Sequence, residues 1–228
     1  LDTSASLLSL IGLFLLYILL SNVLEKKEVF YSTVILGISS FVAILYGILQ
    51  LFGKFIIPLP FTQTASFNSV GSVNALALFV AVMVPLFVIL AMVNKRVLRV
   101  IFVLALLASV MLLIMIDFSP AWWVLVIGSA ALMAIGMQKR DVFDNRWLII
   151  PMFFLAIALL FNFFNIQIPT HASRSIEVYL AQKPSWTVAW ETVKESPILG
   201  SGPGTFVYDF AKYEKAEWFN ATNFWNVR

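Results

Sequence analysis

Cysteine is absent from this chain of 228 residues, and histidine occurs once. The lack of cysteine excludes disulfide bonds, thiolate nucleophiles and Cys-ligated metals, and a single histidine excludes a metal site built from several His ligands. Charge is also scarce, because Asp, Glu, Lys and Arg make up 12% of the residues, about half of the roughly 25% that soluble domains carry. These shortages exclude a soluble globular fold, a disordered chain and a secreted disulfide scaffold.

Apolar residues take the place of the missing charge, at 61% of the chain, and they gather in long runs. A helix needs about 20 apolar residues to cross roughly 30 Å of hydrocarbon. Six runs reach about that length: approximately Ala5–Leu24, Phe30–Phe52, Ser72–Val93, Val97–Asp117, Phe118–Met137 and Trp147–Asn165. The runs are long and do not alternate, which favours helices over strands. The sequence therefore predicts an all-α polytopic membrane protein with about six transmembrane helices.

Several residues punctuate these runs. Asp117 and Pro120 divide the fourth run from the fifth, because a proline near the start of a run ends the previous helix and opens the next, and they predict a tight helical hairpin. Trp122, Trp123 and Trp147 are expected in the aromatic belt at the membrane interface. Polar residues inside the runs are expected mainly to form helix–helix hydrogen bonds; they are Gln50, Asn74, Asn162 and Asn165.

The basic residues of the short loops predict the orientation. Alternate loops carry eight of them: Lys26, Lys27, Lys95, Arg96, Arg99, Lys139, Arg140 and Arg146. The intervening short loops carry only Lys54. We therefore expect the basic loops to face the cytoplasm and Leu1 to begin outside. The formal charge of +3 is too small to suggest a nucleic-acid partner. Since the chain starts at Leu1 and stops at Arg228 in a polar stretch, we expect a piece of a longer protein.

The last part of the chain differs in composition, and we divide the chain into a transmembrane region (1–165) and an extracytoplasmic segment (166–228). Two short amphipathic helices are predicted in the second region. One spans about Ser185–Ser196, with Ser185 as its N-cap, and the other about Thr205–Glu217. Both helices are expected to lie along the membrane surface with their aromatic faces towards the lipid.

Few residues of the tail suggest chemistry. Gly200, Gly202 and Gly204 lack the Lys-Ser/Thr ending of a nucleotide loop, so they indicate either a plain turn or a turn whose following amides hold one phosphate oxygen. His171 is either an ordinary interfacial residue or a general base. Arg174 and Arg228 either reach lipid phosphates or grip a diphosphate with their planar forks. No metal or cofactor is expected.

One segment carries a resemblance. The stretch from Trp190 through Pro197 to Gly200-Ser-Gly-Pro-Gly-Thr-Phe206 resembles the signature of bacterial O-antigen ligases and related O-antigen polymerases. The stretch from Phe67 through Asn74 to Pro85 looks like the family's Asn-containing start of a central span, and the order of spans before a long outside loop is also similar. This resemblance implies a glycosyltransferase in the bacterial inner membrane that uses neither nucleotide nor metal.

The resemblance implies transfer of a glycan from an undecaprenyl-diphosphate carrier to a saccharide acceptor. Arginines bind the diphosphate in this family, and here Arg174 and Arg228 are the candidates, since Ser185-Trp186-Thr187 stands where relatives often have an arginine. Sugars stack on tryptophan faces, which adds Trp186 and Trp190 to the substrate-binding candidates Gly200, Gly202 and Gly204. The family's loop histidine follows the glycine turn, so His171 is not equated with it and the catalytic base is unassigned.

Two other functions fit a polytopic chain. A transporter or flippase for lipid-linked sugars would be expected to have buried ionisable groups and an internal repeat, and the sequence has neither. A non-catalytic scaffold for envelope assembly would tolerate removal of the charges in the 166–228 segment.

Overall fold

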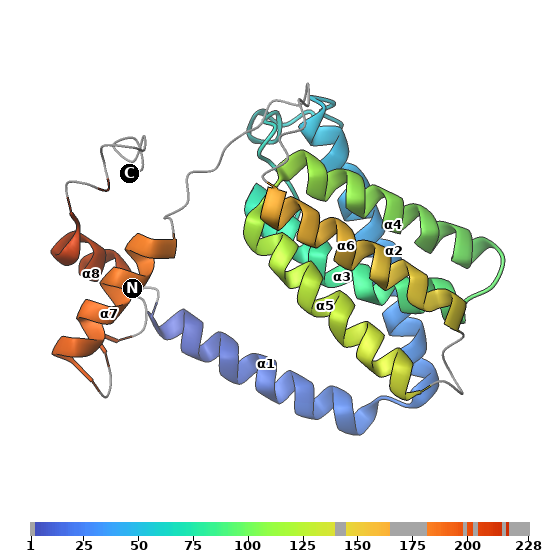
Figure 1. The fold of residues 1–228 in the computed structure, drawn as a ribbon, viewed down its shortest axis with the longest axis horizontal. Helices are drawn as coiled ribbons and strands as arrows, with labels where there is room; N and C mark the ends of the chain where they lie inside the picture. Colours follow the sequence, from blue (N-terminus) through green and yellow to red (C-terminus); the bar gives the residue numbers. More distant parts are fainter. Residues whose placement is uncertain are drawn as a thin grey trace. The chain divides into compact units, whose positions relative to one another are not determined.

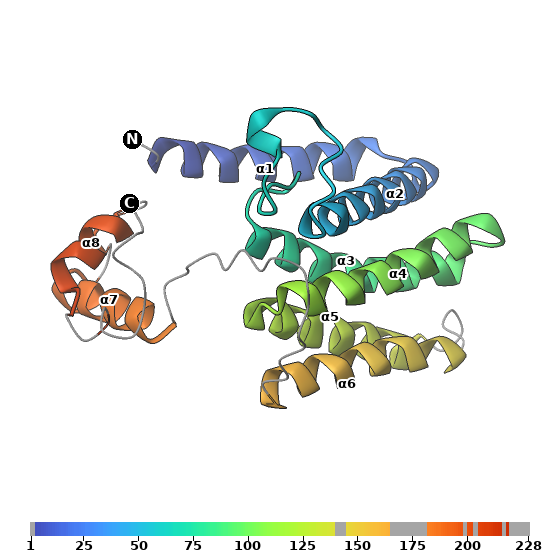
Figure 2. The same ribbon diagram turned by 90° about the horizontal axis from the view of Figure 1, so that it is seen from above.

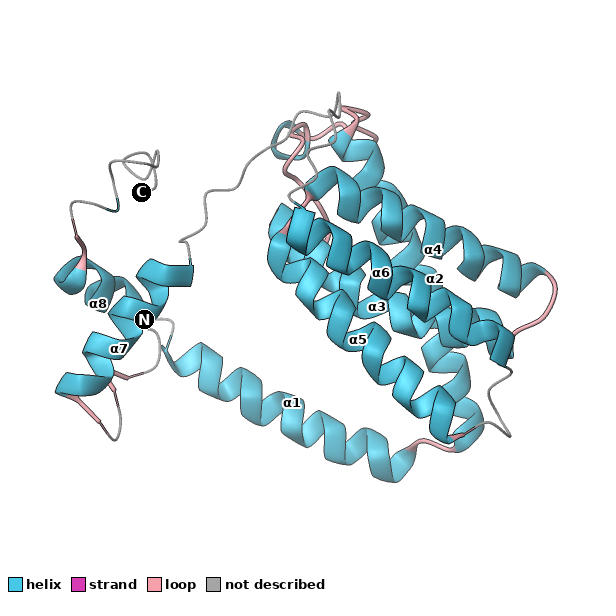
Figure 3. Cartoon of the chain, viewed as in Figure 1, coloured by secondary structure: helices cyan, strands magenta, loops and turns pink. Residues whose placement is uncertain are grey.

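The computed structural model describes residues 3–139, 145–164, 182–197, 200–202, 205–215 and 218. Throughout these ranges every regular element is a helix and none is a strand (Figure 3). The described residues divide into two compact units, one drawn from Leu1–Lys26 with Val178–Arg228 and the other from Lys27–Glu177. The predicted all-helical architecture is confirmed, and the predicted boundary between 1–165 and 166–228 stays a prediction.

Among the described residues, five helical segments are long and apolar enough to cross a membrane. They are α2 (Lys26–Leu51), α3 (Val73–Val93), α4 (Val97–Ile116), α5 (Ser119–Gln138) and Arg146–Phe164, in which the 3-10 helix η2 (Asn145–Leu148) leads into α6 (Ile149–Phe164). A further helix, α1 (Thr3–Val23), is apolar over the shorter stretch Leu8–Val23. This set agrees with the prediction of about six spans, and its lengths fit a multi-pass membrane protein.

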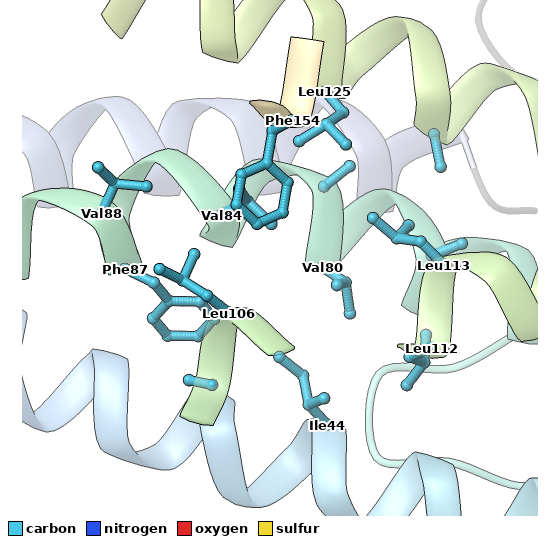
Figure 4. Close-up of a cluster of buried hydrophobic side chains, with 14 of the residues drawn as sticks. Ile44, Val80, Val84, Phe87, Val88, Leu106, Leu112, Leu113, Leu125 and Phe154 are labelled. Carbon is cyan, nitrogen blue, oxygen red and sulfur yellow. The ribbon is translucent and has the colours of Figure 1, made fainter. Parts of the chain in front are cut away.

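The helix α3 lies at the centre of the bundle formed by α2 to α6. It packs against α4 and α5, and α6 packs against α5 (Figure 1) (Figure 2). Side chains from all five helices meet in the core (Figure 4). Phe87 of α3 and Phe102 of α4 are fully buried there, with stacked rings. Small residues allow close approach: a Cβ on Gly37 of α2 would lie 2.6 Å from Cδ1 of Leu90.

Apart from Lys54 in the loop between α2 and α3, the described basic residues of the bundle gather at one end. Lys27 lies at the start of α2, Lys95 and Arg96 form the α3–α4 turn, Lys139 follows α5, and Arg146 lies in η2. Figure 1 shows these helix ends on the same side of the bundle, away from the loop between α2 and α3. The charge separation read from the sequence is therefore present in the fold, and its assignment to the cytoplasm stays a prediction.

One arginine of this group connects three elements. The Nε of Arg99 in α4 donates to the carbonyl oxygens of Ala91 (3.2 Å) and Asn94 (3.1 Å) at the end of α3. Its guanidinium lies 5.5 Å from the ring centroid of Trp147 in η2, a cation–π distance. Arg99 therefore satisfies carbonyls left open by the end of one helix and holds the start of α6 beside them.

The predicted hairpin between α4 and α5 is confirmed. Asp117 ends α4 in the left-handed conformation (φ 49°), and its N–H donates to the Leu113 carbonyl. Pro120 lies in the first turn of α5, where its missing N–H costs nothing. Asn162 of α6 accepts from the Ser119 hydroxyl of α5 at 3.2 Å, which is the helix–helix hydrogen bond expected for a polar residue inside a span.

The aromatic-belt expectation was wrong for Trp122. This residue is 1% exposed, stacks on Phe161 with ring centroids 4.5 Å apart, and donates from Nε1 to Oδ1 of Asp117 at 3.2 Å. Its neighbour Trp123 is 45% exposed, as a belt residue would be. Adjacent residues on a helix point about 100° apart, so only one of the pair faces outwards.

Candidate functional site

The described part of the tail is a helical hairpin in which α7 (Gln182–Glu195) packs against α8 (Phe206–Tyr213). The sequence predicted a start at about Ser185, with that residue as the N-cap. The structure corrects this, because α7 begins at Gln182 and Pro184 lies in its first turn. Amides of the first turn have no partner within the helix, so a proline is accepted there.

The connection between the helices depends on glycine. Gly200 has φ of 58° and Gly202 has φ of 108°, and both conformations disfavour residues with a Cβ. Thr205 is the N-cap residue of α8. The helix ends before Glu214, whose backbone is extended, and therefore falls short of the predicted end at Glu217. The predicted turn between two short helices is present.

A pocket of about 250 Å³ opens where α7, the glycine turn and the start of α8 meet. Its wall combines apolar side chains with hydroxyls and one carboxylate. The lining residues are Ala189, Thr192, Val193, Gly200, Ser201, Gly202, Thr205, Phe206 and Asp209. Most of this wall belongs to the segment that carries the family resemblance, and Ala189 and Asp209 flank that segment.

Ser201, Thr205 and Asp209 form a hydrogen-bonded cluster in this pocket. The hydroxyl oxygens of Ser201 and Thr205 lie 2.6 Å apart. The Ser201 hydroxyl donates to Oδ2 of Asp209. The Thr205 hydroxyl lies 2.7 Å from the Gly202 carbonyl oxygen and 3.4 Å from the same Oδ2. The cluster joins the turn to the first turns of α8.

This cluster has more acceptors than donors. Each hydroxyl supplies one hydrogen, and an ionised carboxylate and a carbonyl supply none. The two hydrogens of Ser201 and Thr205 are thus shared among the contacts to each other, to Asp209 and to Gly202. A ligand group that donates hydrogen bonds, such as a sugar hydroxyl, would complete such a cluster.

The two tryptophans selected from the sequence lie together on α7. The ring centroids of Trp186 and Trp190 are 6.4 Å apart and their planes differ by 14°. The residues are 71% and 53% exposed, whereas Val188 of the same helix is fully buried. Stacked, exposed indole rings are suited to the apolar face of a sugar ring or to the membrane interface.

An ion pair connects the two helices of the hairpin. Lys212 of α8 donates to Oε2 of Glu195 at the end of α7. The hydrogen bonds from Lys212 and then Tyr213 lower the pKa of Glu195, and the bond to Glu195 raises the pKa of Lys212 above its ordinary value. The bond to Glu195 also raises the pKa of Tyr213. Both charged groups are solvent-exposed, so this pair adds modestly to stability.

The other selected residues are distributed as follows. Gly200 and Gly202 lie in the turn and line the pocket. Arg174, Arg228, Gly204 and His171 lie outside the described residues. Within the described ranges no group of three or more His, Asp or Glu side chains could hold a metal ion, and we assign no metal ligand there.

Sequence reasoning missed Ser201, Thr205 and Asp209 as a group. A signal was available, because the three positions are spaced four residues apart, the interval that places side chains near one another along a helix. The spacing was obscured by the glycines between Ser201 and Thr205, which indicated only a turn.

Comparison with family profiles, with curated proteins and with solved structures gives no match.

Proposed function

We propose that this chain belongs to a membrane glycosyltransferase of the O-antigen ligase type, which transfers a glycan from an undecaprenyl-diphosphate carrier to a saccharide acceptor. In this proposal the α7–α8 hairpin lies on the extracytoplasmic side of a bacterial inner membrane. The observation that carries the proposal is the pocket beside Gly200 and Gly202, because it joins an acceptor-rich cluster to the segment that resembles the family.

Sugar binding is the chemistry for which this hairpin is suited. Carbohydrates present hydroxyl donors around their rims and C–H groups on their faces. Asp209, Ser201 and Thr205 offer acceptors to hydroxyls, and Trp186 and Trp190 offer exposed aromatic faces. A pocket of about 250 Å³ accommodates part of a saccharide, such as one ring, and leaves the remainder in solvent.

The transfer forms one bond and breaks another. The acceptor hydroxyl oxygen bonds to the anomeric carbon as the bond from that carbon to the carrier phosphate breaks. The hydroxyl proton goes to a base, and the electron pair leaves with the diphosphate. Hydrogen-bond acceptors that orient the hydroxyl contribute through positioning, and Arg174 and Arg228 are the candidates for stabilising the charge on the departing diphosphate.

The test is an assay of the full-length protein in membranes with lipid-linked glycan as donor. We expect Asp209→Asn to lower transfer at least about tenfold, the scale of one lost charge-assisted hydrogen bond. Glu214→Gln is the matched control, since Glu214 is an exposed acid at the end of the same helix, and it should retain transfer. Circular dichroism of both variants checks that the fold is kept.

The two arginine candidates provide an independent test of the proposal. Arg174→Ala and Arg228→Ala are expected to lower transfer at saturating acceptor. If these two variants and Asp209→Asn all retain full transfer, the proposal is wrong. A dependence on the proton or sodium gradient would instead support a transporter, and unchanged cell-surface glycan in a deletion strain would support a scaffold.

A further inference from the structure

In the loop between α2 and α3, buried polar side chains form hydrogen bonds with the loop's backbone. Gln50, at the end of α2, is 1% exposed, and its Nε2 donates to the carbonyl oxygens of Thr62 (2.8 Å) and Thr64 (3.3 Å). Thr62 is 2% exposed, and its hydroxyl lies 2.7 Å from the carbonyl oxygen of Ile57 and 2.9 Å from that of Leu59. Backbone carbonyls of the loop are thereby satisfied from within.

A further buried side chain, Asn68, forms hydrogen bonds with the backbone of the second half of this loop. Asn68 accepts at Oδ1 from the N–H groups of Val70 and Gly71, each at 2.9 Å. Its Nδ2 donates to the carbonyl oxygens of Ser66 (3.1 Å) and Gly71 (3.0 Å). Asn68 therefore uses its whole amide on the loop's own backbone, as Asx turns do.

One part of the outside of this loop, from Phe55 to Phe61, is apolar. It displays several large hydrophobic side chains, each between 38% and 66% exposed: Phe55, Ile56, Ile57, Leu59 and Phe61. We call these five residues the loop face. The ring of Phe61, the last residue of the loop face, packs edge-on against the ring of Phe67, with centroids 5.8 Å apart. Exposed apolar groups of this number are costly in water and need a partner.

The loop face follows the exposed apolar side of a helix of membrane length. Leu45 and Leu49 of α2 and Phe52 just after it are 40%, 37% and 50% exposed, and α2 is long and apolar enough to cross a membrane. In the chain, only Gly53 and Lys54 lie between Phe52 and the first residue of the loop face. Lys54 is the only charged residue from 52 to 72.

We propose that the loop face is embedded at the boundary between lipid headgroups and acyl chains, at the end of α2, with Lys54 at the level of the anionic phosphates. Irregular backbone is tolerated near hydrocarbon only when its polar groups are satisfied internally, and Gln50, Thr62 and Asn68 satisfy backbone groups of this loop. Lipid is favoured over a protein partner because the face follows a helix of membrane length and has one charged residue beside it, the cation Lys54, which suits anionic headgroups.

The experiment uses the absence of native cysteine, since a single introduced cysteine then carries one nitroxide label at a known site. Ile56→Cys and Phe61→Cys report on the loop face. Gln63→Cys and Ser69→Cys are matched controls, being exposed polar positions of the same loop. Each labelled full chain is reconstituted in vesicles of phosphatidylethanolamine and phosphatidylglycerol. Electron paramagnetic resonance then compares relaxation by oxygen, which partitions into lipid, with relaxation by a water-soluble nickel complex.

We expect labels at positions 56 and 61 to be relaxed more by oxygen than by nickel, and labels at 63 and 69 to show the reverse. Equal nickel accessibility at all four positions would overturn the proposal, since the loop face would then lie in water. Shielding of positions 56 and 61 from both reagents would also overturn it, because a protein surface would then cover the face. Phe61→Cys removes the ring contact with Phe67, so Ile56→Cys is the variant that keeps the test valid if Phe61→Cys fails to fold.

Discussion

Gly128 of α5 lies against Pro85 in the middle of α3, so closely that a Cβ on the glycine would be 2.8 Å from Cγ of the proline ring. The proline has no N–H for the helix, and its ring fills space on the surface of α3. The glycine gives that ring room. A kink-prone residue in the central helix is thus paired with the smallest residue of its neighbour.

The first prediction concerns this contact. Gly128→Ala should lower the free energy of unfolding by about 1–3 kcal/mol, because a rigid ring cannot move aside as a flexible side chain can. Thermal unfolding in detergent measures the change. Gly12→Ala is the control, since no atom lies within 4 Å of a Cβ placed there, and it should be neutral or stabilising. Equal effects of the two substitutions would refute the packing argument.

The second prediction concerns Gln50. Gln50→Leu removes the amide that donates to the Thr62 and Thr64 carbonyls, so at least one buried acceptor is left unmet, at about 1–3 kcal/mol. We expect a lower unfolding temperature and earlier proteolysis within the 53–72 loop, read by mass spectrometry of the fragments. Gln63→Leu, at an exposed position of the same loop, should leave both unchanged. An intact loop in Gln50→Leu would contradict the proposed role.

The third prediction concerns Tyr46, one turn before Gln50. Its hydroxyl is buried and has no hydrogen-bond partner among the described residues, while its ring packs edge-on against Phe67 with centroids 6.3 Å apart. Removing an unmet buried hydroxyl is neutral or favourable when the shape is kept. Tyr46→Phe should therefore keep or raise the unfolding temperature, and Tyr46→Ala should lower it by removing the ring. A clear loss of stability in Tyr46→Phe would show that the hydroxyl has a partner.

The fourth prediction concerns the pH dependence of the hairpin. The pKa of Glu195 is lowered from 4.5 in the folded chain, so its contribution is complete above about pH 4.5 and is lost as the pH falls through the lowered value. The pKa of Lys212 is raised from 10.5, so its contribution is complete below about pH 10.5 and is lost above it. The ion pair between Lys212 and Glu195 therefore contributes fully to stability between these two pH limits.

Hydrogen exchange of the α8 amides, corrected for intrinsic rates, measures the contribution of the Lys212–Glu195 ion pair. Protection should decrease as the solution is acidified below about pH 4.5 and as salt is added, since the pair is exposed. Glu195→Gln should remove both dependences, and Glu214→Gln should keep them. If the wild-type chain and Glu195→Gln show the same salt and pH response, the pair does not hold the hairpin.

Much of the bundle was readable from the sequence because each span is a property of its own residues. A run such as that of α3 is apolar except for Asn74 and must form its backbone hydrogen bonds internally in a membrane, so it is expected to be helical. The break at Asp117 and Pro120 was readable for the same reason, since a proline near the start of a run is well accommodated in the first turn of a new helix. The turn at Gly200 and Gly202 followed from local backbone freedom.

Contacts between distant residues were not readable in this way. Nothing in the local sequence distinguishes Gln50, which holds a loop, from Asn162, which bridges two helices. Trp122 and Trp123 are adjacent and identical in type, yet only one is buried. The cluster of Ser201, Thr205 and Asp209 was also missed, because it needs the turn to bring Ser201 towards the start of α8.

The sequence alone determined that this is an all-helical protein with spans of membrane length, basic residues on alternate loops and a glycine turn between two short helices in its tail. These features depend on hydropathy and backbone conformation, which are local. Only the tertiary structure decided that Gly128 accommodates Pro85, that Gln50 builds the α2–α3 loop and that Asp209 lies in a pocket. Each of these depends on atoms that are far apart in the chain and meet only when the helices pack.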